Sequence, residues 1–446
     1  MSLRKSTIHQ SFFYFLISLL VIFNGGNYDL ISQLNFILVS IFFLNCLKDL
    51  NYKANIKKLY IDNKQIIIFY LFFLLYLFFQ IIPLPIDFLK FFSPTKYNLL
   101  IKLNFENNFS SISFDNGKSF FDILNYCSLI LYVILFKSIF YRERDKKKFY
   151  FFLTFISFVA SIVAVYFYLI GNPDFLFISN NNYQNSSTGF FINRTVFACF
   201  LNLGFLAGLE YLKFADLNKK RNDNFFSKIY LRLFLLFITI GIITSFSRLG
   251  NFLFLLLIIF YLFNFYKKKD NQSIFIFYSL IAIILFDILI LGFYFGGFQL
   301  IDRFAFLKSD FNIYTSENNL SLDISSRGGI AKFTLKELDN FLLFGYGSGN
   351  FELIFKNFYD KLGINFANHA HFDLGEFIGE LGFVGILLLL IPIYKIFKKI
   401  KLNNIKNFYL IIFVILILAF DFSLHILIIQ IIIVLLFSIN TKRLFS

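Results

Sequence analysis

Apolar runs long enough to cross a lipid bilayer recur along almost the whole of this 446-residue chain. A transmembrane helix needs about 20 mostly apolar residues, with a range of about 17–25. Polar turns at 245–251 and 421–425 divide the two longest runs into four spans. The pattern therefore predicts an all-α integral membrane fold with about twelve transmembrane helices, near residues 8–24, 30–47, 65–82, 120–140, 149–170, 190–212, 229–247, 249–266, 274–297, 372–397, 405–421 and 422–440.

Lysine and arginine gather in every second loop between these spans. The basic loops lie at 48–64, 142–148, 213–228, 267–269 and 395–406, and Lys442 and Arg443 follow the last span. Cytoplasmic loops of membrane proteins carry an excess of Lys and Arg, so both termini are predicted to be cytoplasmic. The net charge of +15 is then largely an orientation signal and an attraction to anionic membrane lipids, and it requires no nucleic-acid partner.

The composition favours one membrane domain over the whole chain, 1–446. The sequence is 58% hydrophobic and 15% charged, whereas soluble domains carry about a quarter charged residues. The longest polar segment, 298–371, lies between the ninth and tenth predicted spans, on the non-cytoplasmic side. Loops of this length are usually functional. The three cysteines are far apart within apolar runs and show no metal-ligand spacing, so no metal or other cofactor is predicted.

The end of this loop carries the densest group of candidate functional residues. Residues 368–385 read NHAHFDLGEFIGELGFVG. His369 and His371 stand at the junction between the loop and the tenth span. Glu376 and Glu380 follow one helical turn apart, inside that span. A charged residue at bilayer depth costs about 2.5–3.5 kcal/mol on insertion scales, so such residues mark functional sites by default.

A structural explanation of the carboxylates stays open. Asp373 and Glu376 have the spacing of a helix-capping box. His371 would then precede the helix at its positive end, which keeps the imidazole neutral and able to accept a proton from a sugar hydroxyl. His425, near the same face, is expected to contribute little. The helix also carries small residues that suit close helix packing, at Gly375, Gly379, Gly382 and Gly385.

Three arginines are predicted to lie at the same non-cytoplasmic face. They are Arg194, which follows Asn193 at the start of the sixth span, Arg248, in the turn after the seventh span, and Arg327, in the long loop. Arginines at a bilayer edge can simply extend toward lipid headgroups. Three of them beside a histidine pair favour an anion-binding site, because guanidinium groups bind phosphate bidentately. A lipid-linked diphosphate is the expected ligand.

Four segments, in this order, resemble the O-antigen ligase and polymerase superfamily. They are GFFINRTVFACFL from Gly189, SFSRLG from Ser245, FLLFGYGSGNFE from Phe341, and His371 followed by Glu380, Gly382 and Gly385 at the spacing of the family's signature helix. The resemblance covers roughly residues 185–440. It implies a multi-pass protein of the bacterial inner membrane, with cytoplasmic termini and a large periplasmic loop at 298–371.

The resemblance also implies a chemistry. The protein would transfer a glycan from an undecaprenyl-diphosphate donor to a sugar hydroxyl, with inversion and without a metal or nucleotide cofactor. The acceptor would be lipid A-core in a ligase, or another lipid-linked glycan in a polymerase. Arg194, Arg248 and Arg327 would neutralise the departing diphosphate, and His371 would assist the acceptor hydroxyl. The remaining substrate-binding positions would be Asn193, His369, Glu376 and Glu380.

Two other classes of function remain open. About twelve spans also suit a transporter, such as a flippase for lipid-linked oligosaccharides. Transporters bind substrate near the bilayer midplane, whereas the charged residues of this chain gather at one face. A purely structural membrane protein would leave the histidine-rich end of the loop without a role.

Overall fold

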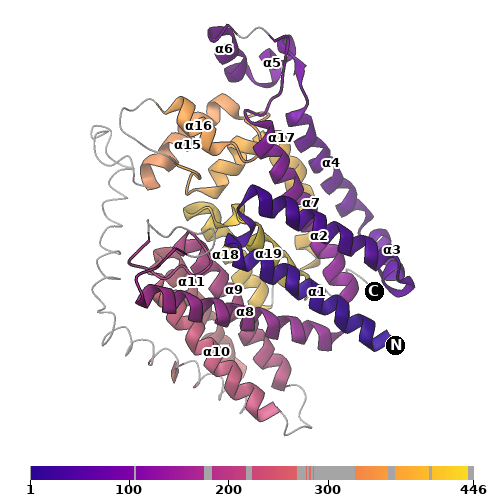
Figure 1. The fold of residues 1–446 in the computed structure, drawn as a ribbon, viewed down its shortest axis with the longest axis vertical. Coiled ribbons are helices and arrows are strands. Elements are labelled where there is room, and N and C mark those ends of the chain that lie inside the picture. The colour runs from indigo at the N-terminus through magenta and orange to yellow at the C-terminus, as the bar shows by residue number, and fades with distance from the viewer. Residues whose placement is uncertain are drawn as a thin grey trace.

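The computed structural model of the chain is a bundle of helices with very little β-structure (Figure 1). The structure describes residues 2–104, 107–174, 183–216, 224–268, 327–359, 367–400 and 404–439, together with 278, 281, 282 and 285. Within these ranges the strands are β1 (Leu84–Pro85) and β2 (Phe109–Ser110), which pair antiparallel. The predicted all-α class is therefore confirmed.

Each predicted span except the ninth coincides with a helix. The ninth, 274–297, lies outside the described residues apart from isolated positions. Among the described residues, seven helices are long and apolar enough to cross a membrane, and four shorter segments are also apolar. The count of twelve stays a prediction. The bundle helices are α1 (Ser2–Ile22), α2 (Asp29–Leu47), α4 (Lys64–Ile81), α7 (Asn116–Ile139), α8 (Glu143–Leu169), α9 (Arg194–Asp216), α10 (Asn224–Thr244), α11 (Arg248–Lys268), α17 (Asp373–Lys399), α18 (Ile405–Phe420) and α19 (Leu427–Ile439).

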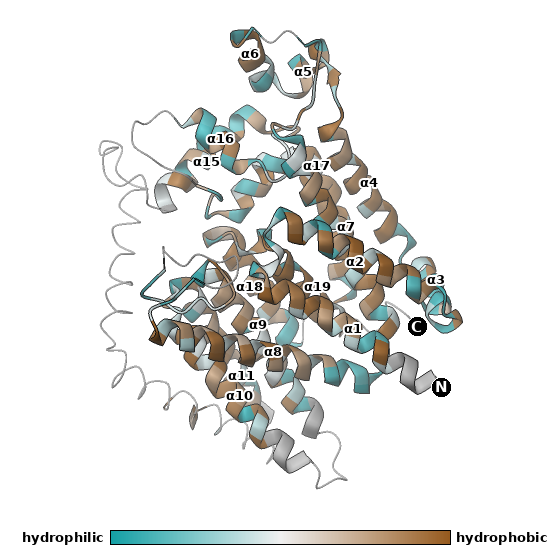
Figure 2. Cartoon of the chain, in the orientation of Figure 1, coloured by the Kyte–Doolittle hydropathy of each residue, from teal (hydrophilic) through white to brown (hydrophobic). Residues whose placement is uncertain are grey.

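Shorter elements join and cover the ends of these helices. They are η1 (Asn24–Gly26), α3 (Leu50–Asp62), α5 (Ile86–Phe92), α6 (Pro94–Lys102), α15 (Arg327–Phe341), α16 (Phe351–Phe358) and η3 (Ser423–His425). In Figure 1, α5, α6, α15 and α16 lie at one end of the molecule, and α3 and the N-terminus lie toward the other. Within the long polar segment, α15 is followed by a glycine-rich turn and then by α16. Figure 2 shows the apolar residues concentrated in the bundle and more polar ones at its ends.

The central helix of the bundle is α9, which is almost completely buried. It packs against α8, α10, α11 and η3. Small residues allow this close approach: Gly204 faces Ser157 of α8, and Gly250 of α11 faces Ala198 of α9. Asn202 of α9 donates a hydrogen bond to the carbonyl of Gly250 at 2.9 Å. The packing fixes the first residues of α9 and α11 next to each other, at the end of the bundle where η3 lies.

The signature helix α17 is interrupted at Gly382, where φ is 65° and ψ is 174°. This backbone conformation is essentially restricted to glycine. Phe383 and Val384, just after the interruption, donate their N–H groups to the carbonyls of Leu342 and Leu343 at 2.7 and 3.2 Å. The sequence-based expectation of a continuous helix with Gly382 on a packing face is therefore wrong. Local residue preference favours a helix here, but contacts from the preceding loop override it.

The carbonyls freed by the interruption also have partners. The carbonyl of Glu380 accepts from Gln80 Nε2 at 3.0 Å and from Gly347 N at 3.2 Å. The carbonyl of Leu381 accepts from the Tyr76 hydroxyl at 2.7 Å. Irregular backbone at membrane depth is tolerated only where protein satisfies its polar groups. Helix α4 and the glycine-rich loop before α16 provide those groups, and they fix Glu380 at the interruption.

We expect Gly382→Ala to prevent stable folding. An added Cβ would stand 2.5 Å from the Gly345 nitrogen and from the Leu343 carbonyl oxygen, and the backbone conformation alone costs about 1–3 kcal/mol for other residues. The matched control is Gly171→Ala, where φ is also positive, at 88°, but nothing lies within 4 Å of an added Cβ. Thermal unfolding in detergent should show a much larger loss for Gly382→Ala. Equal melting temperatures for the two variants would contradict this role of the interruption.

Candidate functional site

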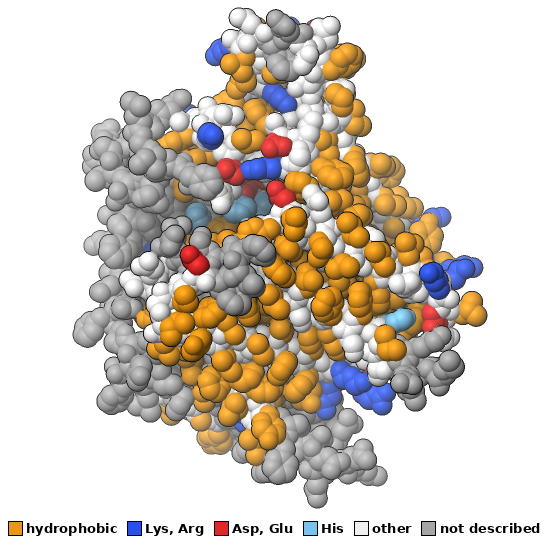
Figure 3. Space-filling model, viewed as in Figure 1, with side chains coloured by type: hydrophobic (Ala, Val, Ile, Leu, Met, Phe, Trp, Pro, Cys, Tyr) orange, Lys and Arg blue, Asp and Glu red, His pale blue; other side chains and the backbone are white. Residues whose placement is uncertain are grey.

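Half-buried histidine and fully buried carboxylate side chains gather at the end of the bundle that carries α15 and α16. The set, which we call the His–carboxylate cluster, consists of His369 before α17, Asp373, Glu376 and Glu380 in the first turns of α17, and His425 in η3. The three carboxylates are at most 1% exposed. In Figure 3, histidine side chains are visible in a recess of the surface with acidic side chains nearby.

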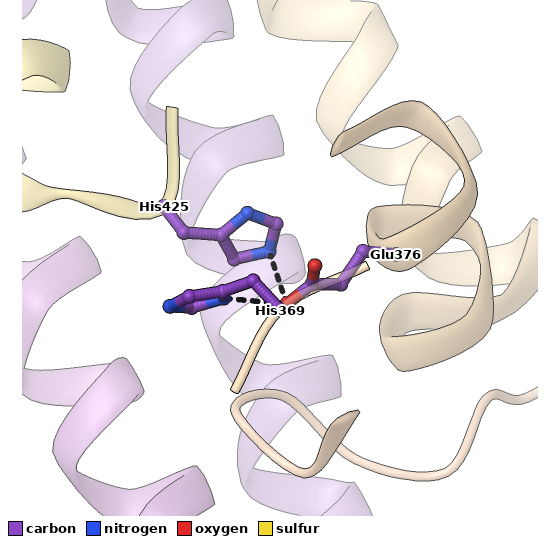
Figure 4. Close-up of side chains that lie close together, drawn as sticks. All are labelled: His369, Glu376 and His425. Carbon is purple, nitrogen blue, oxygen red and sulfur yellow. Dashed lines mark hydrogen bonds and ion pairs between the residues drawn. The ribbon is translucent and has the colours of Figure 1, made fainter. Parts of the chain in front are cut away.

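Glu376 occupies the centre of this cluster. Its Oε1 lies 2.8 Å from His369 Nδ1 and 3.7 Å from His425 Nε2 (Figure 4). Its other oxygen, Oε2, accepts a hydrogen bond of 2.6 Å from the backbone N–H of Ala370. One carboxylate on α17 thus holds the segment before the helix and faces η3 at the same time.

Asp373 connects the start of α17 to η3 and does not cap its own helix. Its Oδ1 is hydrogen-bonded to His425 Nδ1, and its Oδ2 accepts from the backbone N–H of Leu424 at 2.9 Å. The backbone N–H of Asp373 donates to the carbonyl of Asp421 at 3.0 Å. The N-cap residue is Phe372, without a side-chain cap bond. The predicted capping box is therefore wrong, because contacts across η3 engage the carboxylate.

His425 contacts all three carboxylates of the cluster. Its imidazole stacks on the Phe377 ring with 4.0 Å between centroids, and its Nε2 lies 3.4 Å from Glu380 Oε2. Its Nδ1 is hydrogen-bonded to Asp373, and Glu376 Oε1 lies 3.7 Å from its Nε2. In its protonated form, His425 therefore compensates the charge of the carboxylates around it.

The glycine-rich segment 345–349 completes the surroundings of Glu380. The backbone N–H of Gly349 donates to Glu380 Oε1 at 2.9 Å. The neighbouring Ser348 hydroxyl donates to Asp122 Oδ2, on α7, at 2.6 Å. This segment therefore ties α7 to the part of α17 that carries the cluster.

Three atoms of the cluster could also hold a metal ion. His369 Nδ1, Glu376 Oε1 and His425 Nε2 all lie within 4.8 Å of one another (Figure 4). Imidazole nitrogen and carboxylate oxygen are ligands that Zn²⁺ accepts. The bond from His425 to Asp373 is also of the kind that orients metal-bound histidines. The arrangement can serve as a proton-holding network or as a metal site, and sensitivity to a chelator distinguishes the two.

His371, the predicted catalytic residue, lies beside the cluster. It directly precedes the N-cap residue of α17 and has a positive φ of 53°. Its ring meets the ring of Phe422 edge-on at 4.9 Å, while His369 stacks on the same Phe422 ring at 4.5 Å. His371 is half-buried. The two histidines thus share one aromatic neighbour, and His369 is also hydrogen-bonded to Glu376.

The predicted arginines all stand at helix starts. Arg194 and Arg248 are half-buried first residues of α9 and α11. These two starts adjoin, because the Ser247 hydroxyl lies 3.1 Å from the Thr195 hydroxyl. Arg327 begins α15, and its side chain lies outside the described part of the structure.

Asn193 has a clear local role at the start of α9. Its Oδ1 accepts from the backbone N–H groups of Thr195 and Val196 at 2.7 and 3.3 Å. Its amide nitrogen donates to the Tyr183 hydroxyl at 3.2 Å, and the Arg194 guanidinium lies over the same Tyr183 ring, 5.4 Å from the centroid. Asn193 therefore caps the helix and helps to place Arg194; a direct substrate contact stays a prediction.

Sequence reasoning missed the importance of His425, Asp373 and Asp122. His425 and Asp373 are 52 residues apart, and no short motif links them. Asp122 lies still farther away in the chain, on α7. A charged residue within an apolar run was the one available signal for Asp122. The structure places His425 in the middle of the cluster, a position that no sequence motif indicates.

Comparison with known protein families gives one match. A sequence model described as O-antigen ligase matches residues 233–390. The matched range contains Arg248, Arg327, His369, His371 and the two glutamates of the cluster, while Arg194 and His425 lie outside it. No curated protein matches the chain.

We expect His425→Ala to destabilise the protein, because it leaves the buried carboxylates without their cation. Breaking a buried ion pair costs about 3–5 kcal/mol. Adding Glu380→Gln to His425→Ala should recover part of the loss, since it removes one negative charge. His9→Ala is the control, because His9 makes ring contacts with Phe42 and Tyr52 instead of ion pairs with the cluster. Unchanged thermal stability of His425→Ala, or no recovery in the double variant, would contradict charge compensation.

Proposed function

Because the chain belongs to the O-antigen ligase superfamily, we propose that it transfers a glycan from undecaprenyl diphosphate to a sugar hydroxyl. Members of this family are glycosyl-transferring membrane proteins of surface polysaccharide biosynthesis. The reaction would take place at the periplasmic face of the bacterial inner membrane, with both termini in the cytoplasm. The observation that supports it most is the buried His–carboxylate cluster beside His371, at the end of the bundle where α9 and α11 begin with arginines.

The donor diphosphate would bind at the adjoining starts of α9 and α11. Arg194 and Arg248 stand there at the ends of a central buried helix and its neighbour. Guanidinium groups bind phosphate oxygens bidentately. Positive charge fixed in advance also stabilises the negative charge that develops on the leaving diphosphate. Arg327, at the start of α15, would supply a third cation from the long loop.

The acceptor would react beside His371. Its hydroxyl oxygen would attack the anomeric carbon of the donor sugar as the bond from that carbon to the diphosphate oxygen breaks, which inverts the configuration. The hydroxyl proton would pass to His371, and undecaprenyl diphosphate would leave. Glu376 holds the backbone of Ala370, the residue before His371, at 2.6 Å. The cluster would thus position the base, and neither a metal nor a nucleotide takes part.

The acceptor decides between two forms of the same reaction. A hydroxyl of lipid A-core would make the protein a ligase, and a hydroxyl of another lipid-linked glycan would make it a polymerase. Deletion of the gene for this protein distinguishes the two forms. Loss of polymer that leaves bare lipid A-cores indicates a ligase, and cores that carry single repeats indicate a polymerase. Accumulation of the lipid-linked unit at the cytoplasmic face would instead indicate a flippase.

His371→Ala should lose most of the transfer activity, and His369→Ala should lose less. General-base assistance contributes about 10²–10⁴-fold to the rate, so the loss is large enough to be measured from initial rates of transfer. The assay is transfer by the purified protein from a synthetic undecaprenyl-diphosphate glycan, with and without a chelator. Wild-type transfer rates for the His371→Ala variant would exclude His371 as the general base. Abolition by the chelator would instead indicate that the cluster holds a metal.

Arg248→Ala should weaken donor binding and transfer while the amount of folded protein stays unchanged. Arg248→Lys should restore only part of the activity, because an ammonium does not reproduce the bidentate fork. For Arg327 we also expect the Lys variant to be less active than the wild type and more active than the Ala variant. The control is Arg142→Ala, an exposed arginine in a predicted cytoplasmic loop whose guanidinium lies over the Tyr141 ring. Full activity of Arg248→Ala would mean that this side chain extends to lipid headgroups only.

A further inference from the structure

A second site lies outside the His–carboxylate cluster, in the segment between α4 and α7. It is an open pocket of about 480 Å³, lined in part by Leu353 of α16. The pairing of β1 with β2 fixes one wall, because Leu84 is paired with Ser110 and Pro85 with Phe109. The side chains that matter for its chemistry are Lys96, Phe109, Ser111, Asp115 and Asn116.

Lys96 supplies a buried cation to this pocket. Lys96 is only 7% exposed. Its Nζ donates hydrogen bonds to the carbonyls of Ser111 and Ser113 at 2.8 and 2.5 Å. Burial lowers the pKa of Lys96 to about 8. An ammonium has three N–H donors, so these two bonds leave one. Within the described residues no carboxylate forms an ion pair with Lys96.

The rest of the lining adds further donors, acceptors and an aromatic surface. Asn116 Oδ1 accepts from the Ser111 hydroxyl at 2.7 Å, which fixes the amide. Asp115 Oδ1 caps α7 by accepting from Gly117 N at 2.8 Å. The Phe109 side chain is 58% exposed, a large apolar surface in contact with solvent beside these polar groups. The pocket therefore combines fixed polar groups of both kinds with an open phenyl ring.

We propose that this pocket binds a sugar residue of the acceptor glycan. A sugar presents hydroxyls that both donate and accept, and an apolar C–H face that packs on an aromatic ring, and ligand sites of this kind join apolar walls with a few fixed polar groups. The pocket is lined by one positive side chain, Lys96, and one negative side chain, Asp115. These charges offset each other, so the pocket offers little net electrostatic attraction to a phosphate. The inference rests on the proposed function, since only that function defines a glycan acceptor.

The position of the pocket fits the acceptor better than the donor. In Figure 1, α5 and α6 lie at one tip of the molecule, away from α9 and α11, which begin with the arginines. Two hydrogen bonds connect the pocket to the cluster. Asp115 N donates to Asn350 Oδ1 at 3.0 Å, and the adjacent Gly349 N donates to Glu380 Oε1 at 2.9 Å. A glycan held here would extend toward α17.

The absence of tryptophan from the sequence allows a direct binding test. Phe109→Trp places a single tryptophan at the pocket, which can be excited selectively over the tyrosines, and Phe88→Trp, on α5 and equally exposed at 58%, is the matched control. The purified full-length protein in nanodiscs, without donor, is titrated with maltotriose, chitotriose and inorganic phosphate. We expect a saturable change in emission at millimolar sugar for Phe109→Trp and none for Phe88→Trp. Asn116→Ala and, separately, Lys96→Met in the Phe109→Trp background should each weaken binding at least tenfold.

The outcomes separate this proposal from the proposed function. No response to either sugar, or a saturable response to phosphate alone, would overturn the sugar site even if glycan transfer is measured. A saturable sugar response that Asn116→Ala weakens supports the site even if transfer is never observed, in which case the transferase proposal fails alone. Should Lys96→Met fail to fold, Asn116→Ala carries the test, because its side chain lies at the start of α7 and not in a buried core.

Discussion

The close approach of two glycine backbones, at Gly345 and Gly382, is the contact on which the rest of the site depends. A Cβ on Gly345 would meet the carbonyl oxygen of Glu380 at 2.2 Å, so the loop can reach the open turn of α17 only without side chains at these positions. The same approach lets the loop satisfy the backbone groups that the interruption frees. It also directs the N–H of Gly349 to the Glu380 carboxylate.

Burial of several carboxylates in one place makes the cluster dependent on its histidines. Three acidic side chains on the first turns of α17 are excluded from water, and charges without partners are costly at that depth. His425 supplies compensation from η3, and His369 supplies a hydrogen bond from the preceding loop. This cost explains why three segments far apart in the chain meet here. It also gives a rigid support to the segment that carries His371, because Glu376 holds the backbone N–H of the preceding Ala370.

The sequence was sufficient for features that depend on local pattern. Apolar runs located the helices of the bundle, apart from the ninth predicted span, which lies outside the described residues. Features that depend on long-range contacts could not be read in this way. The sequence around Gly382 is compatible with a continuous helix, and only the loop at Gly345 shows why it opens. Asp373 had the spacing of a cap, yet its partner is a histidine 52 residues away.

The most direct test of the account is the stereochemistry of transfer. A donor of known anomeric configuration on undecaprenyl diphosphate is incubated with the purified protein and acceptor, and the new linkage is assigned by NMR. Direct attack by an acceptor hydroxyl, assisted by His371, predicts complete inversion. Retention would contradict the account, because it requires a covalent glycosyl intermediate on a carboxylate, for which Glu376 and Glu380 would be the candidates.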